Sequence, residues 1–368
     1  MKSIGLFWLK NQQIENKCEK CPYNSQEQPE QEKNNQEGNE NFDFQINLWN
    51  SKVKDTKKRV VFQFKAIDFG VICPLSTKKL IFLFPFEVKR TDFYDFVKCL
   101  SLNTDLLCTV FNEDLKSSSE PAKSYHTIDG DSSNIHYLMY ELSKENIEEI
   151  NYDAQLNLTQ ITITINSNFN KDEFLAYRLF LRFRIKLDSF SAFAKKKKVS
   201  NDWLQSAFSS TYMFDIRLND VRELSKKRKE LVEHQGFKLP VFSKVHFFYM
   251  ADSEEIVENG SSIQLDKRLL ENDRWHTYLG DNFEFASENI AHHWKKKEEF
   301  KMSLSKVSNK GSQNTRIDTI AKREPVREFT IFFKTEFSDI RLKRIVGYLC
   351  LIIILGALSS TIASFLFG

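Results

Sequence analysis

The chain ends in an uncharged, strongly apolar run, IVGYLCLIIILGALSSTIASFLFG, at positions 345–368. At about 1.5 Å per residue, a helix of this length reaches roughly 36 Å, more than the roughly 30 Å hydrocarbon core of a bilayer. Arg341, Lys343 and Arg344 come directly before it, so the positive-inside rule keeps the preceding chain in the cytoplasm. The pattern predicts a tail-anchored, single-pass membrane protein, in the inner membrane if the source is bacterial. A buried core helix is the alternative.

Small residues recur along this run at a spacing of four. Gly356, Ser360 and Ser364 would lie on one helix face, where small side chains let helix backbones approach closely in lipid. We therefore expect a homo-oligomer that assembles through the membrane helix, with the lipid bilayer as a partner. A passive tether, in which these residues have no packing role, is the alternative.

The rest of the chain has the composition of a folded, β-rich protein. Hydrophobic residues make up 41% and charged residues 28%, which excludes global disorder and a multi-span channel. The 33 Phe outnumber the 11 Gly and 7 Pro, and Phe favours strands over loops. No regular alternation of strands and helices appears, so the predicted fold class is α+β, with mainly antiparallel strands, plus one C-terminal transmembrane helix.

Alternation of apolar and polar residues marks individual strands. It is clearest at 177–187, where every second residue is apolar, and we expect this strand to form an antiparallel hairpin with 158–165. A short strand is expected at 106–111. Helices are expected at 201–208 and 286–300.

Shifts in composition divide the chain into four parts. Residues 1–42 are predicted to be a flexible N-terminal segment with a linker rich in Gln, Glu and Asn. A β-rich subdomain is expected at 43–190 and a mixed α/β subdomain at 191–340, with one continuous domain as the alternative. Residues 341–368 form the basic flank and the predicted membrane helix.

Basic residues gather on one face of the strand at 177–187. Arg178, Arg182, Arg184 and Lys186 alternate with the apolar face, and Phe180 lies between them. Clustered Arg and Lys neutralise phosphates, and an aromatic ring can stack a base, so these four residues are predicted to bind a nucleotide or nucleic acid. A solvated face balanced by nearby acids and attraction to anionic lipid headgroups are the alternatives.

One set of residues resembles a metal-dependent nuclease site. Asp68, Glu87 and Lys89 follow the order of the PD-(D/E)xK nucleases, in which two carboxylates hold Mg²⁺ and a lysine positions water. The resemblance covers only these residues. No complete metal motif and no phosphate-binding loop occurs in the sequence, so we predict no cofactor, no metal and no catalytic residue.

These features favour a tail-anchored protein whose cytosolic domain senses a ligand or partner and whose span assembles to affect the membrane. This architecture resembles that of prokaryotic antiviral-defence effectors. The first alternative is a membrane-tethered scaffold or adaptor that binds a cytosolic protein or a nucleic acid. The second is a membrane-bound, metal-dependent nuclease.

Overall fold

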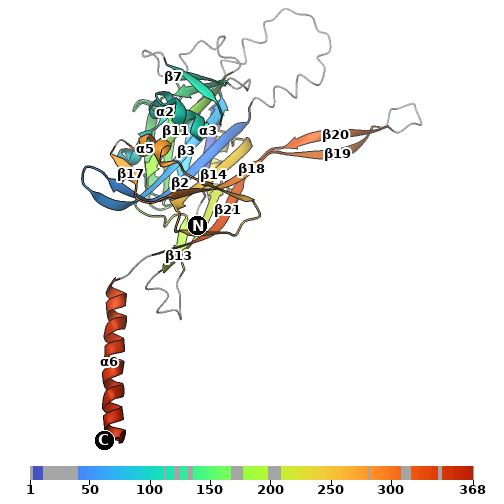
Figure 1. Cartoon of the computed structure of the whole chain (residues 1–368). Helices are drawn as coiled ribbons and strands as arrows, with labels where there is room; N and C mark the ends of the chain where they lie inside the picture. The colour runs from blue at the N-terminus through green and yellow to red at the C-terminus, as the bar shows by residue number, and fades with distance from the viewer. Residues whose placement is uncertain are drawn as a thin grey trace, which may run out of the picture.

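The computed structural model describes residues 3–10, 40–111, 113–119, 125–130, 136–166, 177–197, 209–280, 282–307, 316–338 and 342–367. An 11-stranded sheet organises the fold (Figure 1). Its strands run across the sheet in the order β16 (Leu265–Leu269), β18 (Asn289–Lys297), β14 (Phe242–Asp252), β2 (Phe42–Asp55), β3 (Val60–Pro74), β11 (Tyr177–Lys186), β8 (His136–Tyr140), β7 (Tyr125–Gly130) and β6 (Leu115–Ser119). Two short strands complete it: β17 (Phe283–Phe285) pairs with β2, and β5 (Phe93–Asp95) pairs with β11.

Two four-stranded sheets and a separate strand pair make up the remaining β structure. The first sheet contains β1 (Gly5–Lys10), β4 (Thr77–Phe84), β10 (Leu158–Thr164) and β9 (Ile147–Asp153). The second contains β12 (Ala194–Lys196), β13 (Ser209–Leu218), β21 (Phe329–Ser338) and β15 (Ile256–Asn259). The separate pair is β19 (Glu299–Val307) and β20 (Arg316–Glu324).

The helices of the described chain are short, apart from the last. They are α2 (Val97–Ser101), α3 (Thr104–Phe111), α4 (Val221–Lys229), α5 (Asn272–Leu279) and α6 (Leu342–Phe367). A 3-10 turn, η2 (Arg90–Asp92), precedes β5, and a π-helical turn, η4 (Glu230–His234), continues α4.

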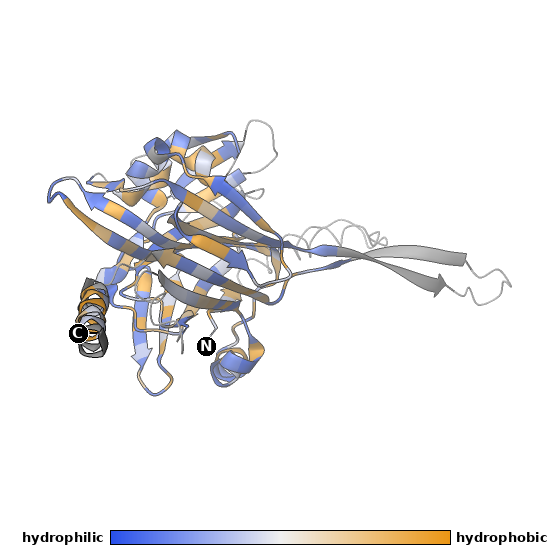
Figure 2. Ribbon diagram, turned by 60° about the horizontal axis from the view of Figure 1, so that its bottom comes forward, coloured by the Kyte–Doolittle hydropathy of each residue, from blue (hydrophilic) through white to orange (hydrophobic). Residues whose placement is uncertain are grey.

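The main hydrophobic core lies between the large sheet and the two four-stranded sheets. Alternate residues of the large sheet point into it, for example Phe44, Ile46 and Leu48 of β2, and they share this core with Phe82 of β4 and Phe333 of β21. Figure 2 shows the same alternation of hydrophobic and hydrophilic residues along the strands. Period-two alternation places these residues on one face of the large sheet, and packing of that face against the smaller sheets gives a layered sandwich.

The other face of the large sheet is covered in part by helices. A second core joins Trp49 of β2 and Phe180 of β11 to Leu100, Leu107 and Trp275, which lie in α2, α3 and α5. Figure 1 shows these three helices gathered on one side of the sheet, with β13 and β21 on the other. The fold therefore has three layers: helices, a large sheet and small sheets.

The predicted transmembrane helix is wrong. Within the described part of the chain, none of the helices combines the length and the apolar character that crossing a bilayer requires. Side chains of α6 are described only from Val346 to Ser360. The fold class of the described chain is a β-rich layered structure.

The packing role predicted for the small residues of α6 depended on that span. Gly356 and Ser360 are exposed, and a Cβ added to Gly356 would meet nothing within 4 Å. The side chain of Ser364 lies outside the described residues.

Several expected elements differ in type or in pairing. Residues 106–111 belong to helix α3, and most of 286–300 forms strands, chiefly β18. β10 and β11 do not form a hairpin, because β10 pairs with β4 and β9 while β11 pairs with β3 and β8. Local periodicity cannot reveal such long-range pairing, which decides that 289–297 is a strand and that β10 and β11 do not pair. The helix predicted at 201–208 lies outside the described residues.

Strands from both predicted subdomains meet in the large sheet. β2, β3 and β11 come from 43–190, and β14 and β18 come from 191–340. β14 runs parallel to β2 and joins the two sets at the centre of the sheet.

Candidate functional site

A cavity of about 460 Å³ opens on the helix-covered face of the large sheet. We call it the outer cavity. Its floor comes from β2, β14, β18 and β11, and its walls from α3, α5 and β16. The residues used below are Gln45, Asn47, Arg182, Lys244, His246, Phe248, His293 and Lys295. The volume is in the range of small-molecule sites in proteins.

Strand register aligns five residues of this face in one cross-strand row. Lys295 of β18 pairs with His246 of β14, which pairs with Gln45 of β2. Gln45 pairs with Gly70 of β3, and Gly70 pairs with Arg182 of β11. Paired residues of neighbouring strands point to the same face of a sheet. Residues far apart in sequence are therefore brought to one level of the cavity.

Gly70 allows Arg182 to reach across β3. A Cβ at position 70 would lie 2.9 Å from Arg182 Nη1, closer than real Cβ contacts come, and a tight 3.1 Å from Gln45 Oε1. With no side chain there, Nη1 crosses the strand and donates to Gln45 Oε1 at 3.0 Å. Close approach of a side chain to the backbone is a common reason for glycine inside a strand.

Arg182 is fully buried, and its partners are neutral. Its Nε donates to Tyr278 Oη at 2.9 Å, and in the amide orientation that satisfies both of its ends, Asn47 accepts from Nη2 at 2.6 Å. Arg182 makes no ion pair with a carboxylate among the residues that the structure describes. A buried charge without a counter-charge is costly, so this guanidinium creates a positive potential under the cavity.

The neighbouring Arg184 is neutralised by Asp68. Arg184 Nε donates to Asp68 Oδ1 at 2.6 Å and Nη2 donates to Oδ2 at 3.0 Å, in a bidentate pair that is almost fully buried. Trp49 Nε1 and Tyr278 Oη also donate to Oδ2, at 2.6 and 2.8 Å. Arg182, Arg184 and Asp68 together have one net positive charge. This charge is on Arg182, which lines the cavity.

The hydrogen bond from Arg182 fixes which way the Gln45 amide group points. Arginine can only donate, so the Gln45 oxygen faces Arg182 and the amide nitrogen is left to donate elsewhere. Gln45 is half-buried and lines the outer cavity. Its N–H groups can therefore donate to an anion held there.

Aromatic rings form the adjoining wall. Phe248 and His293 lie opposite each other on β14 and β18 and stack with ring centroids 4.1 Å apart and planes 5° apart. His246 joins them, with its Nδ1 3.1 Å from His293 Nε2 and its ring 12° from the plane of His293. All three are half-buried and line the outer cavity, so aromatic rings form part of its surface.

Lysines and one carboxylate, Asp266, lie around the two histidines of this wall. Burial and then the neighbours His293, Lys295, Lys244 and Lys297 lower the pKa of His246 from 6.5 to about 3. Burial and Lys295 lower the pKa of His293 to about 4, and burial with nearby lysines lowers the pKa of Lys295. With pKa values of about 3 and 4, both histidines are uncharged at neutral pH, so Lys244 and Lys295 supply the positive charge of this wall.

The predicted ligand-binding residues occupy different environments. Arg182 lines the outer cavity, whereas Arg184 is held by Asp68 beneath it. Arg178 pairs with Asp43 at 3.0 Å, and Lys186 lies over the ring of Tyr94, 4.8 Å from its centroid. Only Arg182 of the four reaches the cavity.

The residues of the nuclease alternative differ in exposure. Asp68 is fully buried and paired with Arg184, whereas Glu87 and Lys89 are exposed in the segment after β4. No group of three or more His, Cys, Asp or Glu side chains that could hold a metal ion occurs in the described ranges.

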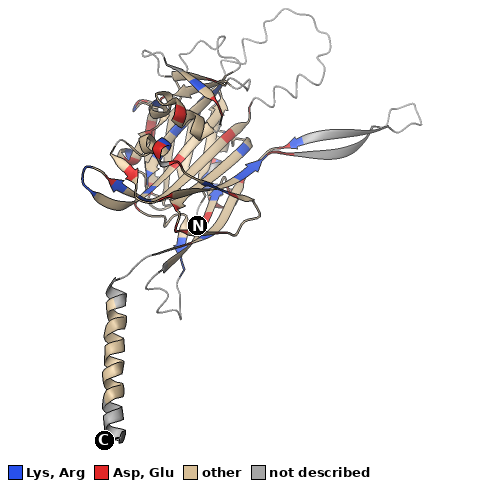
Figure 3. Ribbon diagram, viewed as in Figure 1, with Lys and Arg blue, Asp and Glu red and all other residues tan. Residues whose placement is uncertain are grey.

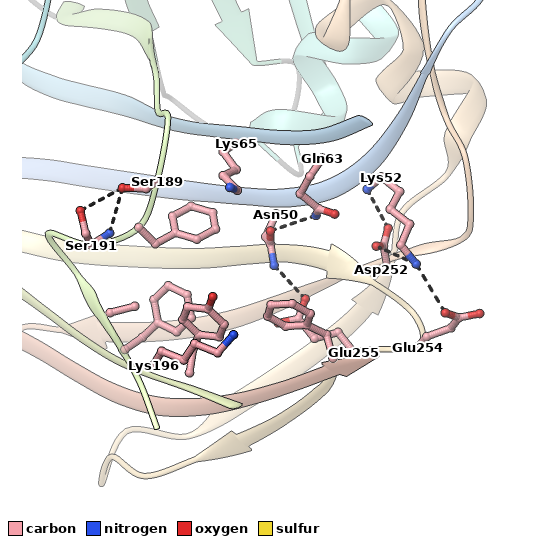
Figure 4. A pocket seen from close by; sticks show the side chains of 15 residues that line it. Asn50, Lys52, Gln63, Lys65, Ser189, Ser191, Lys196, Asp252, Glu254 and Glu255 are labelled. Atoms are coloured by element: carbon pink, nitrogen blue, oxygen red, sulfur yellow. Dashed lines mark hydrogen bonds and ion pairs between the residues drawn. The ribbon is translucent and has the colours of Figure 1, made fainter. Parts of the chain in front are cut away.

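A second cavity of about 540 Å³, the interlayer cavity, lies between the large sheet and the sheet of β12, β13 and β21. Some of its charged groups bind one another, as Figure 4 shows for Lys52, which lies 3.8 Å from Asp252 and 3.6 Å from Glu254. Glu255 accepts from Tyr249 Oη at 2.6 Å and from Asn50 Nδ2 at 3.1 Å. Burial raises the pKa of Glu255 to about 7. We consider this cavity secondary because its polar groups have internal partners.

The sequence analysis missed Gln45, His246, His293 and Lys295. His293 and Lys295 lie in 286–300, which was predicted to be a helix, and residues two apart in a helix do not share a face. The alternation of Lys244, His246 and Phe248 in 242–252 was the available signal, because it places all three on one strand face.

Comparison with known proteins adds no family: no protein-family model matches the chain, and no curated protein matches it significantly.

Proposed function

We propose that this protein binds a small, phosphate-bearing ligand with a planar base, of the size of a mononucleotide, in the outer cavity. The phosphate lies near Gln45 and Lys295, and the base stacks on the cluster of Phe248, His293 and His246. One observation carries the proposal: Arg182 is a buried cation whose partners are neutral, and it orients Gln45 to donate into the cavity.

The dimensions of the cavity favour a small ligand over a polymer. A volume of about 460 Å³ bounded by α3, α5 and β16 accommodates a mononucleotide-sized molecule. Recognition of a nucleic acid strand uses an extended groove that follows the backbone over several nucleotides. We therefore place the nucleotide before the nucleic acid among the partners considered from the sequence.

A ligand-sensing role for the folded body remains compatible with this proposal. The effector role expected of a membrane span depended on the helix corrected above and is not part of it. A protein partner and a homo-oligomer stay predictions from sequence.

Isothermal titration of the full chain with adenosine 5′-monophosphate, adenosine and inorganic phosphate tests the proposal. We expect the monophosphate to bind most tightly, since only it engages both the cationic and the aromatic parts of the cavity. Affinity for it should fall as salt rises, because ions screen charge interactions. Tighter binding of adenosine than of its monophosphate would contradict the proposal, as would the absence of binding by all three.

The sharpest variant is Gln45→Glu. It retains the shape of the side chain and gives Arg182 a carboxylate, so the fold should be at least as stable while the affinity for the monophosphate falls at least tenfold. Gln63→Glu is the matched control, because it makes the same change of charge at an exposed position of β3 that lines the interlayer cavity. Equal affinity of the two variants would overturn the role of Gln45. If an oligonucleotide of single-stranded DNA bound more tightly than the monophosphate, the polymer would be the ligand and the proposal would be wrong.

A further inference from the structure

The hairpin that joins β2 and β3 exposes an apolar tip. Val60, Val61 and Phe62 are consecutive, and 53%, 55% and 37% of their respective surfaces are exposed. Figure 1 shows this hairpin reaching past the rest of the large sheet. Consecutive residues of a strand point to opposite faces, so apolar surface is present on both faces of the tip.

Basic side chains surround these apolar residues. Lys54, Lys57, Lys58 and Arg59 are all exposed, and Figure 3 shows positive charge at this end of the hairpin. None of the four forms an ion pair with a carboxylate within the described ranges. The acid of the turn, Asp55, is buried, and its Oδ1 accepts from the backbone N–H groups of residues 57 and 58, at 3.0 and 2.9 Å.

The tip is held in place before it meets a partner. The backbone N–H and the hydroxyl of Thr56 both donate to the carbonyl of Asn282, at 2.9 and 3.1 Å. Phe62 packs edge-on against Phe283, with ring centroids 5.8 Å apart. A preorganised tip loses little conformational freedom on binding.

We propose that this tip binds the surface of an anionic lipid bilayer, with Val60, Val61 and Phe62 entering the interface and the basic residues contacting the headgroups. Amphipathic elements with this composition bind at the boundary of headgroups and acyl chains, and basic residues next to the bilayer are attracted to anionic lipids. The charge of the tip is complementary to such a surface. The proposal concerns peripheral contact and is independent of the outer cavity.

The arrangement of the apolar residues selects lipid over the other candidates. A protein partner packs on one face, whereas this tip is apolar on both faces, as an element surrounded by lipid should be. A nucleic acid would use the basic residues but would gain nothing from two exposed valines.

Co-sedimentation of the full chain with vesicles tests the proposal. We expect binding to vesicles of phosphatidylcholine with 30% phosphatidylserine to exceed binding to phosphatidylcholine alone at least fivefold. The double variant V60D/V61D should lose most of this excess, and so should K57E/K58E. Leu102→Asp is the matched control, because Leu102 is 71% exposed in the turn after α2, away from the tip. Tip variants that bind like the control would overturn the proposal.

A fluorescence measurement locates the contact even if another segment also binds lipid. The variant Phe62→Trp adds one tryptophan at the tip, and its emission is the difference between the fluorescence of the variant and that of wild type. We expect brominated lipids in anionic vesicles to quench this added emission. Unquenched added emission in a protein that sediments with the vesicles would show that another segment makes the contact, and the proposal would be wrong. Folding of each variant is checked by its unfolding transition in urea, and the tip variants are expected to match wild type because the changed side chains are exposed.

Discussion

Arg182 Nη1 donates to Gln45 Oε1 at 3.0 Å across the backbone of Gly70, and this contact joins two strands that do not pair with each other. It connects a buried positive charge to an amide that lines the outer cavity. The contact shows how a polar group that is not itself charged can have a central role in the proposed anion site. It also explains why glycine occupies a central strand, where it otherwise weakens the sheet.

The first prediction concerns Gly70→Ala. The added methyl group would lie within 2.9 Å of Arg182 Nη1 and displace the guanidinium from Gln45. We expect the free energy of unfolding to fall by about 1–3 kcal/mol, as for other overpacked interiors, and monophosphate affinity to fall with it. Urea unfolding and titration measure the two effects. Gly356→Ala is the control, because its Cβ meets nothing within 4 Å, and equal behaviour of the two variants would contradict the packing argument.

The second prediction separates Arg184 from Arg182. Asp68→Asn leaves Arg184 buried without its counter-charge, so we expect a loss of about 3–5 kcal/mol in the free energy of unfolding. Lys334→Met removes an exposed ion pair with Glu258 and should cost no more than about 1 kcal/mol. Urea unfolding of both variants provides the comparison. Similar losses in the two would mean that burial does not set the strength of the Arg184 pair.

The third prediction concerns pH and the histidine cluster. The pKa of His246 is about 3 in the folded chain, against 6.5 for an ordinary histidine. The unfolded chain therefore binds a proton first, and folded stability falls as pH drops from about 6.5 towards 3. In His246→Asn this slope should weaken, with a difference of about 1–3 kcal/mol between pH 7 and pH 4.5. Urea unfolding without ligand across this range checks it, and parallel curves for variant and wild type would be the contrary result.

The fourth prediction concerns Glu255, for which stability changes with pH in the opposite direction. Burial raises the pKa of Glu255 to about 7 from 4.5, so the folded chain holds a proton that the unfolded chain releases. Folded stability should therefore fall as pH rises from about 4.5 to 7 and level off above 7. Glu255→Gln mimics the protonated form and should be more stable than wild type at pH 8 by up to about 3 kcal/mol. A variant less stable than wild type at pH 8 would show that the ionised carboxylate is the favoured form in the folded chain.

Much of the strand structure could be predicted from local patterns. The alternation of apolar residues at 179, 181 and 183 with Phe180 and Arg182 indicated β11. The first set lies in the main core, whereas Phe180 lies in the second core and Arg182 lines the outer cavity. The partners of β11 could not be predicted, because pairing with β3 and β8 depends on contacts that no local period encodes. The histidine strand β18 was mistaken for a helix because its lysine-rich end carries no apolar alternation.

Only part of the candidate site could be predicted from the sequence. The basic face of β11 pointed to Arg182, but the identical pattern included Arg184, whose charge is cancelled by Asp68. Asp68 lies on another strand, so the sequence alone could not distinguish the two arginines. Gln45 carried no signal of its own, since an amide acquires its role only from the arginine opposite it.

A crystal structure of the full chain soaked with adenosine 5′-monophosphate tests the central claim most directly. The account predicts phosphate density within hydrogen-bonding distance of Gln45 Nε2, with the base stacked on Phe248 and His293, and no such density in crystals of the Gln45→Glu variant. Density for the monophosphate in the interlayer cavity alone, or undiminished density in the outer cavity of the variant, would contradict it.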